Sequence, residues 1–485
     1  MSEELREWRE TRLNSISKSF CAAKWYNASL HLGHGFTNSC HLPLPHPIDL
    51  KELKDNPSAL HNTKHKKEMR KMMLTGVRPA ECSYCWKIED IGRDNISDRV
   101  YKSNIYTDKE IADLKDLDYN QDILLKTVEV SFDRTCNFAC SYCNAGYSTT
   151  WGKDITENGP YQKFKSFSSG AYQSDGSWSE QFSKNGLDNP YVVAFLEWWP
   201  ELTKTLQEIR ITGGEPVQSF NFWNFIELMK KHPSKNLRFA VNSNLGVNER
   251  LLNKLIDATY QLEIKQFDLY TSNESLGLHA EYIRDGLKYD EWRSNMVKFI
   301  EKANPKIFRS LTIMMTVNSL SLVSIVEFLE DIKILKTKYG HNRPNVDLNI
   351  LRWPAFMSPL VLPDNIKKEL HAKLKKWYNE NKNTPLFNIH ELAQFERLLD
   401  YIEVVNRGHS GTESDRDVLF HDFKSFYMQY DKRRGKDFKT TFPELAEWYE
   451  TIEVDDSIPD RPVFNGEISH YEIGEYVPDT KNDKL

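Results

Sequence analysis

The 485-residue chain has few cysteines, no long apolar run and no excess of positive charge. No apolar run approaches the roughly 20 residues that a membrane-spanning helix needs, and the charged start of the chain lacks the apolar core of a signal peptide. Lys and Arg number 64 against 70 Asp and Glu, so the net charge of −6 gives no electrostatic basis for nucleic-acid binding. We therefore expect a cytoplasmic protein that has no membrane segment and no nucleic-acid partner.

Cysteine is confined to one part of the chain. All seven cysteines fall within the first 143 residues, so the later part offers no thiol as a hydrogen donor. In a reducing cytoplasm, cysteines serve metals or catalysis more often than disulfides. The rest of the composition is that of a globular protein, with 39% hydrophobic and 28% charged residues and more length than one typical domain. The cysteines are therefore the first candidates for chemistry.

Strand-like and helix-like segments alternate from about residue 120, which indicates an α/β fold with a mostly parallel sheet. One face of most predicted strands is apolar and the other is polar. We expect the polar face to line an open interior that suits a polar substrate or cofactor, because buried polar groups need partners. An antiparallel sheet with one solvated face is the alternative. The predicted strands are 127–132, 208–212, 237–242, 264–271, 310–317 and 346–351, and the predicted helices are 221–232, 249–260, 292–303, 322–339 and 364–379.

Three cysteines, Cys136, Cys140 and Cys143, follow the first predicted strand on one short loop. Three thiolates at this spacing can bind three irons of a cubane cluster and leave the fourth iron open, whereas an electron-transfer [4Fe–4S] site takes four cysteines. The loop starts at the carboxyl end of a strand, where α/β proteins bind ligands. A structural zinc site and three unrelated buried cysteines are the alternatives.

The C-x3-C-x2-C loop, with Tyr142 before its last cysteine, resembles the signature of the radical S-adenosylmethionine (SAM) enzymes. Gly213-Gly214-Glu215-Pro216, after the second predicted strand, matches the Gly-Gly-Glu-Pro motif of that family. The resemblance implies a partial (β/α)6 barrel in which the open iron of a [4Fe–4S] cluster binds SAM and this motif holds the SAM amino group. It also implies reductive cleavage of SAM to a 5′-deoxyadenosyl radical that abstracts hydrogen from a substrate. An external one-electron donor such as flavodoxin or ferredoxin would be the partner.

Three further positions resemble the family more weakly. Asn244, in the run 242–246 after the third predicted strand, resembles a Thr-Asn-Gly turn. Ser272 and Asn273 end the fourth predicted strand, where family members place a ribose or carboxylate ligand. Arg284 resembles an arginine that pairs with the SAM carboxylate in some members, a role that suits a guanidinium. An ordinary turn or a surface ion pair is the alternative at each position.

Four more cysteines precede the loop in two separated groups, namely Cys21, Cys40, Cys82 and Cys85. Four thiolates suit a closed site for zinc or for a second [4Fe–4S] cluster. The pattern after Cys82-x-x-Cys85 resembles the auxiliary-cluster region of SPASM and twitch domains, through Glu89, Gly92, Ser97 and Arg99. SPASM domains usually follow the barrel, whereas this region precedes it and has cysteines for only one cluster, as in a twitch domain. We expect that cluster to serve electron transfer or structure, because four thiolates leave no open iron.

The resemblance implies an enzyme whose substrate is a peptide side chain or a small molecule, although no residue is identified as catalytic. A nucleotide, sugar or RNA substrate is one alternative, and a non-catalytic zinc-binding interaction module is another. The insertion 146–190 is rich in aromatic residues and is predicted to be a substrate-contacting lid, with a plain surface insertion as the alternative. The expected parts are a cysteine-rich twitch-like region at 1–118, a barrel at 119–384, a helical extension at 385–452 with helices at 392–404 and 417–430, and an acidic disordered tail at 453–485.

Overall fold

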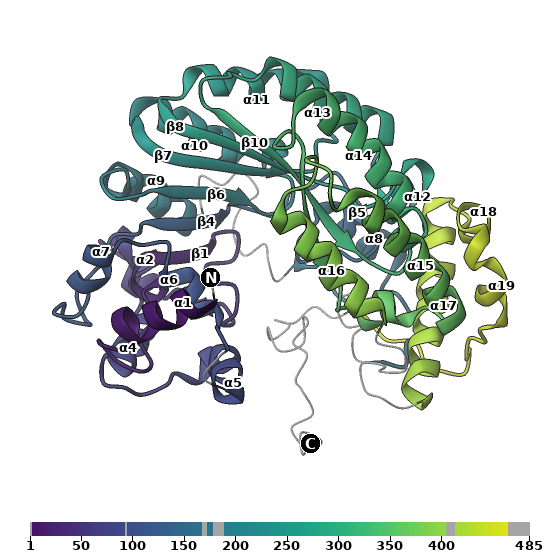
Figure 1. Cartoon of the computed structure of the whole chain (residues 1–485), viewed down its shortest axis with the longest axis horizontal. Coiled ribbons are helices and arrows are strands. Elements are labelled where there is room, and N and C mark those ends of the chain that lie inside the picture. The colour runs from purple at the N-terminus through teal and green to yellow at the C-terminus, as the bar shows by residue number, and fades with distance from the viewer. Residues whose placement is uncertain (1, 93–94, 167–171, 178–188, 404–412, 464–485) are drawn as a thin grey trace.

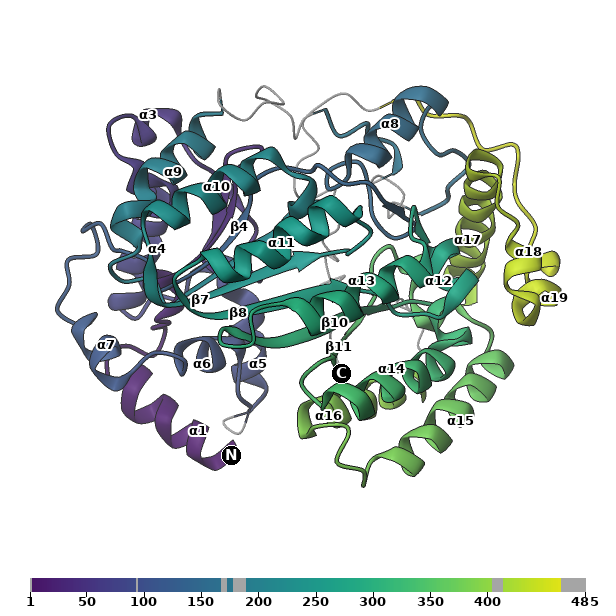
Figure 2. The same cartoon turned by 90° about the horizontal axis from the view of Figure 1, so that it is seen from above.

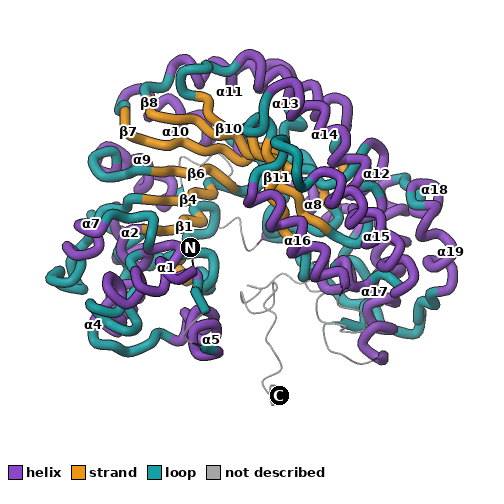
Figure 3. Tube along the Cα trace, in the orientation of Figure 1, coloured by secondary structure: helices purple, strands orange, loops and turns teal. Residues whose placement is uncertain are grey.

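The computed structural model describes residues 2–92, 95–166, 172–177, 189–403 and 413–463. It is a mixed α/β protein built on a nine-stranded sheet with the order β11-β10-β8-β7-β6-β4-β1-β2-β3. Figure 3 shows these strands gathered in one body with the helices around them. The strands are β1 (Asn27–His31), β2 (Phe36–Asn38), β3 (His46–Pro47), β4 (Thr127–Ser131), β6 (Glu208–Thr212), β7 (Ser234–Ser243), β8 (Ile264–Ser272), β10 (Phe308–Val317) and β11 (Asn345–Ile350).

The sheet is parallel from β11 to β1, and only β2 and β3 pair antiparallel at one edge. All six predicted strands are present as β4, β6, β7, β8, β10 and β11, and they follow one another in the sheet as they do in the chain. The prediction of a mostly parallel α/β sheet is therefore confirmed. The connecting helices are α9 (Pro190–Leu202), α10 (Phe220–Lys231), α11 (Glu249–Gln261), α12 (Gly277–Ile283), α13 (Tyr289–Lys302), α14 (Ile325–Tyr339) and α15 (Asp364–Asn381).

The two faces of the sheet differ as the alternation predicts. Val128 and Val130 of β4 are buried on the helix-covered face, whereas Glu129 and Ser131 between them are half-buried on the other. Figure 1 shows the connecting helices as an arc outside the strands, and Figure 2 shows α10, α11 and α13 lying across β7, β8 and β10. The opposite, inner face of the sheet is therefore the polar one. This inner face carries Glu129, Arg210, Asn242, Asp268 and Tyr270.

The N-terminal region shares the main sheet through β1, a strand that the sequence analysis missed. β1 lies parallel to β4, from Asn27 opposite Thr127 to His31 opposite Ser131. Its alternate residues Ala28 and Leu30 belong to the main core, while a second, smaller core includes Cys21, Cys82 and Cys85. The helices of this region are α1 (Ser2–Trp8), α2 (Ala23–Tyr26), α3 (Leu50–Leu53), α4 (Lys64–Leu74), α5 (Ser83–Ile91), α6 (Asp98–Ser103) and α7 (Asp108–Asp113).

Most of the C-terminal helices lie at the end of the molecule opposite the N-terminal region (Figure 1). The C-terminal helices are α16 (Ile389–Glu403), α17 (Glu413–Arg434), α18 (Phe438–Thr441) and α19 (Pro443–Thr451), and the first two correspond to the predicted helices of the extension. The predicted disordered tail falls largely on 464–485, outside the described residues. None of the helices that the structure describes combines the length and apolar character that a membrane span requires.

The insertion 146–190 contains helix α8 (Thr149–Asn158), which the sequence analysis did not predict. Trp151, Tyr161 and Tyr172 are buried in the main core, and the chain after α8 is bound to α17. Asp422 of α17 accepts hydrogen bonds from the backbone N–H groups of Lys165 and Ser166, at 2.7 and 2.8 Å. This part of the insertion therefore contributes to the main core. The remainder of the lid prediction concerns 167–171 and 178–188, which lie outside the described residues.

Candidate functional site

The loop with Cys136, Cys140 and Cys143 leaves the carboxyl end of β4 and meets the Gly-Gly-Glu-Pro turn at the end of β6. The backbone N–H of Glu215 donates to the carbonyl of Thr135 at 2.6 Å, and that of Gly214 donates to the carbonyl of Asp133 at 3.3 Å. A Cβ at Gly214 would lie 2.6 Å from the carbonyl oxygen of Arg134, so only glycine permits this approach. The structure thus joins two motifs that are about 70 residues apart in the chain, at the carboxyl edge where parallel sheets bind ligands.

The turn after β7 holds the same loop from another side. Asn244 Nδ2 donates to Asn137 Oδ1 at 3.0 Å and lies 4.0 Å from the sulfur of Cys136. Asn137 in return donates to the carbonyl of Gly246 at 2.6 Å. A Cβ at Gly246 would collide with the ring of Phe138, so this glycine is also required by a close approach. Asn244 therefore lies beside the cysteine loop.

Glu215 is buried at the centre of these contacts, with 1% of its surface exposed. Its carboxyl group accepts hydrogen bonds from Ser243 Oγ at 2.8 Å, from the backbone N–H of Asn244 at 2.5 Å and from that of Val217 at 3.1 Å. Burial raises the pKa of Glu215 to about 7 in spite of these hydrogen bonds. A cationic group placed beside the carboxyl would favour its ionised form. The turn thus offers an acceptor suited to an ammonium group.

At the end of β8, a buried amide lacks a hydrogen-bond acceptor. Asn273 is fully buried, and its Oδ1 accepts from the backbone N–H groups of Glu274 and Ser275. Its Nδ2 has no partner among the described residues. An unsatisfied buried donor costs about 1–3 kcal/mol, and a ribose hydroxyl or a carboxylate would relieve that cost. Asn273 therefore fits the ligand-binding role that the resemblance gives to it and to the preceding Ser272, which is half-buried.

Arg284 and Tyr142 meet at Glu274, a residue that the sequence analysis did not single out. Arg284 donates through Nε and Nη2 to Glu274 Oε2, at 3.1 and 2.6 Å. The hydroxyl of Tyr142 donates to the same carboxylate, at 3.1 Å from Oε1. The third nitrogen of Arg284, Nη1, lies 3.8 Å from the sulfur of Cys140. The guanidinium is thus already engaged with groups of the protein. The only sequence signal for Glu274 was its place three residues beyond the end of the predicted strand 264–271.

The back of the cysteine loop is held by side chains from the insertion and from α17. Four consecutive carbonyls of the loop each accept a side-chain hydrogen bond. The pairs are Ser148 with Phe138 at 2.6 Å, Tyr430 with Ala139 at 3.3 Å, Trp151 with Cys140 at 2.9 Å and Tyr172 with Ser141 at 2.9 Å. The fold therefore fixes the backbone that carries the three thiols.

Burial raises the pKa of all three loop thiols, in the case of Cys143 to about 12. Mutual repulsion adds to this effect in Cys136 and Cys143. Buried thiolates need positive charge nearby, which a metal centre supplies. N–H groups already point at two of the sulfurs: the backbone N–H of Phe138 lies 3.5 Å from Cys136, and Arg284 faces Cys140. This donor set fits an iron–sulfur cluster that brings its own positive charge.

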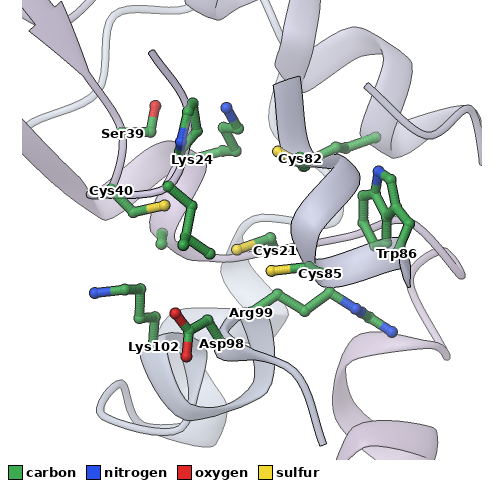
Figure 4. A pocket seen from close by; sticks show the side chains of 14 residues that line it. Cys21, Lys24, Ser39, Cys40, Cys82, Cys85, Trp86, Asp98, Arg99 and Lys102 are labelled. Carbon is green, nitrogen blue, oxygen red and sulfur yellow. The ribbon is translucent and has the colours of Figure 1, made fainter. Parts of the chain in front are cut away.

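The four N-terminal cysteines line one pocket. Figure 4 shows the sulfur atoms of Cys21, Cys40, Cys82 and Cys85 directed into it. Burial raises the pKa of Cys82 and of Cys85 to about 12. Ser39 also lines the pocket, and its buried hydroxyl has no partner among the described residues. A hydroxyl in this place can donate to a thiolate or to a sulfide.

Cationic side chains surround these thiols. Lys24, Arg99 and Lys102 line the pocket, and Lys24 is paired with Glu81. Arg99 donates to Glu89 through Nε at 2.7 Å and through Nη2 at 2.8 Å. Ser97 donates to the same carboxylate at 2.5 Å. The Glu, Ser and Arg of the twitch-like pattern are thus one hydrogen-bonded group beside the pocket.

No three His, Cys, Asp or Glu side chains within the described parts of the chain are arranged as ligands of one metal ion. No protein-family model and no curated protein sequence matches this chain.

Proposed function

We propose that this chain is a radical SAM enzyme, with a SAM-binding [4Fe–4S] cluster at Cys136, Cys140 and Cys143. One observation carries the proposal: hydrogen bonds join the cysteine loop to the Gly-Gly-Glu-Pro turn and to the Asn244 turn at the carboxyl edge of a parallel sheet. Three unrelated buried cysteines would have no need for this arrangement. The sequential order of six parallel strands with helices outside them also suits a partial (β/α)6 barrel.

The residues of the site divide the binding of the cofactors among themselves. The three thiolates hold the cluster, Glu215 and its turn accept hydrogen bonds from the SAM amino group, and Asn273 with Ser272 contacts the ribose or the carboxylate. With both groups bound, the site supplies reductive cleavage of SAM and a 5′-deoxyadenosyl radical that abstracts hydrogen from the substrate. The second cluster, at the four N-terminal cysteines, transfers electrons or supports the structure. The electrons come from an external donor such as flavodoxin or ferredoxin, in the cytoplasm.

The inner face of the sheet is the proposed substrate surface. Arg210 stacks on Tyr270, with its guanidinium carbon 4.4 Å from the ring centroid, and donates to the Tyr270 hydroxyl at 3.2 Å. Glu129 lies opposite Arg210 in the register and accepts a long hydrogen bond from the Thr212 hydroxyl, at 3.4 Å. Asn242 Oδ1 is buried without a partner in the described part of the chain. These groups offer both donors and acceptors, which suits a polar substrate such as a peptide.

Acidic side chains on the inner face argue against a polyanionic substrate such as RNA. Arg238 is bound to Glu208 at 2.8 Å and to Asp268 at 2.6 Å. Asp268 also accepts a hydrogen bond from the Ser310 hydroxyl at 2.5 Å, so the charges of this neighbouring network are paired within the protein. The three acids on this part of the face, Glu129, Glu208 and Asp268, outnumber its two arginines. The resulting negative charge would repel closely spaced phosphates.

Metal analysis after anaerobic purification and reconstitution tests the proposal. We expect about seven to eight irons per chain and a broad absorption band near roughly 400 nm. Replacement of Cys140 by Ala should remove the loop cluster and leave the second one, whereas Cys82→Ala should do the reverse. Each variant should therefore keep about half of the iron. Zinc in place of iron would refute the enzyme and favour an interaction module.

A further inference from the structure

Arg284 lies directly opposite Cys140 in a short antiparallel pair of strands, β5 (Ala139–Cys140) and β9 (Arg284–Asp285). The next residue, Asp285, is bound to Lys436 at 2.8 Å and to Arg434 at 3.3 Å, which fixes β9 to the C-terminal extension. Arg284 therefore has a defined position relative to the thiol of Cys140. This position follows from backbone pairing as well as from side-chain contacts.

The pair Arg284 and Glu274 is buried, with side-chain exposures of 6% and 0%. Glu274 also accepts from the Tyr142 hydroxyl and, at 3.4 Å, from the backbone N–H of Thr316. The guanidinium lies 5.5 Å from the centroid of the Tyr142 ring. Two of the guanidinium nitrogens are used by Glu274, and the third faces the sulfur of Cys140. A SAM carboxylate would have to compete with a carboxylate already in place.

We infer that Arg284, held by Glu274 and Tyr142, is a positioning residue for the cluster, which donates an N–H to the Cys140 thiolate and does not bind the SAM carboxylate. The inference rests on the proposed function, because it assumes a cluster at this loop. Hydrogen bonds to cluster sulfurs and nearby charges set the reduction potential of iron–sulfur centres. Arg284 and Glu274 act in opposite senses, since a cation stabilises the electron that enters the cluster and an anion destabilises it.

Two substitutions therefore have opposite expected effects. Glu274→Gln leaves the charge of Arg284 without its counter-ion and should make the midpoint potential of the loop cluster more positive. Arg284→Gln removes both the cation and the N–H donor to Cys140, and should make that potential more negative. A residue with a merely structural role would lower the stability in both variants, but it would not produce shifts of opposite sign.

The measurement is a redox titration of the reconstituted full-length protein, followed by electron paramagnetic resonance before SAM is added. The loop-cluster signal is the one that Cys140→Ala abolishes, and the signal of the second cluster serves as the internal reference. Glu391→Gln is the matched control: it removes the buried pair of Lys336 and Glu391, joined at 2.7 Å with exposures of 0% and 2%, at the amino end of β11. We expect this control to be destabilised with both midpoint potentials unchanged.

The outcomes are separable from those of the proposed function. A wild-type protein without the loop-cluster signal refutes the proposed function and this inference together. A wild-type protein with the signal, and unchanged or equally shifted potentials in both Arg284 and Glu274 variants, refutes the inference alone. If Arg284→Gln does not assemble the cluster, Arg284→Lys takes its place. Lysine keeps the positive charge but lacks the planar guanidinium, whose nitrogens contact Glu274 and Cys140 at the same time. An unaltered midpoint potential and resonance spectrum of the loop cluster, in both Arg284→Lys and Glu274→Gln, would then refute the inference.

Discussion

At the scale of single residues, the chemistry of the Glu215 carboxyl depends on its surroundings. Three hydrogen bonds favour its ionised form, yet burial dominates and raises its pKa to about 7. A positive charge beside this side chain would favour its ionised form and would be stabilised by it. The sequence could predict the Gly-Gly-Glu-Pro turn as a motif. It could not predict this electrostatic state, which depends on Ser243 and Asn244 of the following strand and turn.

The pH dependence of stability checks this state of Glu215. Because the folded-state pKa of about 7 exceeds the ordinary value of 4.5, the folded protein binds the proton more tightly than the unfolded chain between these values. The contribution of Glu215 to the free energy of unfolding should therefore fall as the pH rises from about 4.5 to about 7, by about 3 kcal/mol, and stay constant above. Chemical denaturation of wild type and Glu215→Gln, compared at each pH, measures this difference. A difference that does not vary with pH would contradict the assignment.

Among the elements, α17 and the insertion determine the shape of the cysteine loop. Tyr430 of α17 donates to the carbonyls of Ala139 in β5 and of Tyr282 in α12, at 3.3 and 3.0 Å, across 291 and 148 residues of the chain. Alternation and turn residues are local signals, and they predicted the strands well. Contacts of this range carry no local signal, so the extension was predicted as helical but not as part of the site. The strand β1 was missed for a similar reason, because its five residues gain their stability from pairing with β4.

Replacement of Tyr430 by Phe tests the role of α17. The change removes one buried hydroxyl that serves two carbonyls, and should lower the free energy of unfolding by about 1–3 kcal/mol. It should also lower the protection of the Cys140 segment from hydrogen exchange. Tyr260→Phe is the control, because its exposed hydroxyl donates to the carbonyl of Lys302 at 3.0 Å and its loss should cost less than about 0.5 kcal/mol. Equal losses in the two variants would argue against a special role for α17.

On the scale of the whole molecule, one sheet connects two cysteine-lined sites. β1 extends the parallel sheet into the N-terminal region, whose own core surrounds Cys21, Cys82 and Cys85. The cysteine spacing predicted both groups of thiols, and the structure brings the second group to one pocket. The sequence did not show that the two regions share a sheet. This continuity joins the N-terminal region to the sheet that carries the cysteine loop.

The central claim is tested most directly by the release of 5′-deoxyadenosine from SAM. The anaerobically reconstituted protein, reduced with dithionite, should form this product, and Cys136→Ala should form none. Cys85→Ala, which alters only the second site, should retain the cleavage. No 5′-deoxyadenosine from an iron-loaded wild type, or undiminished release from Cys136→Ala, would contradict the account.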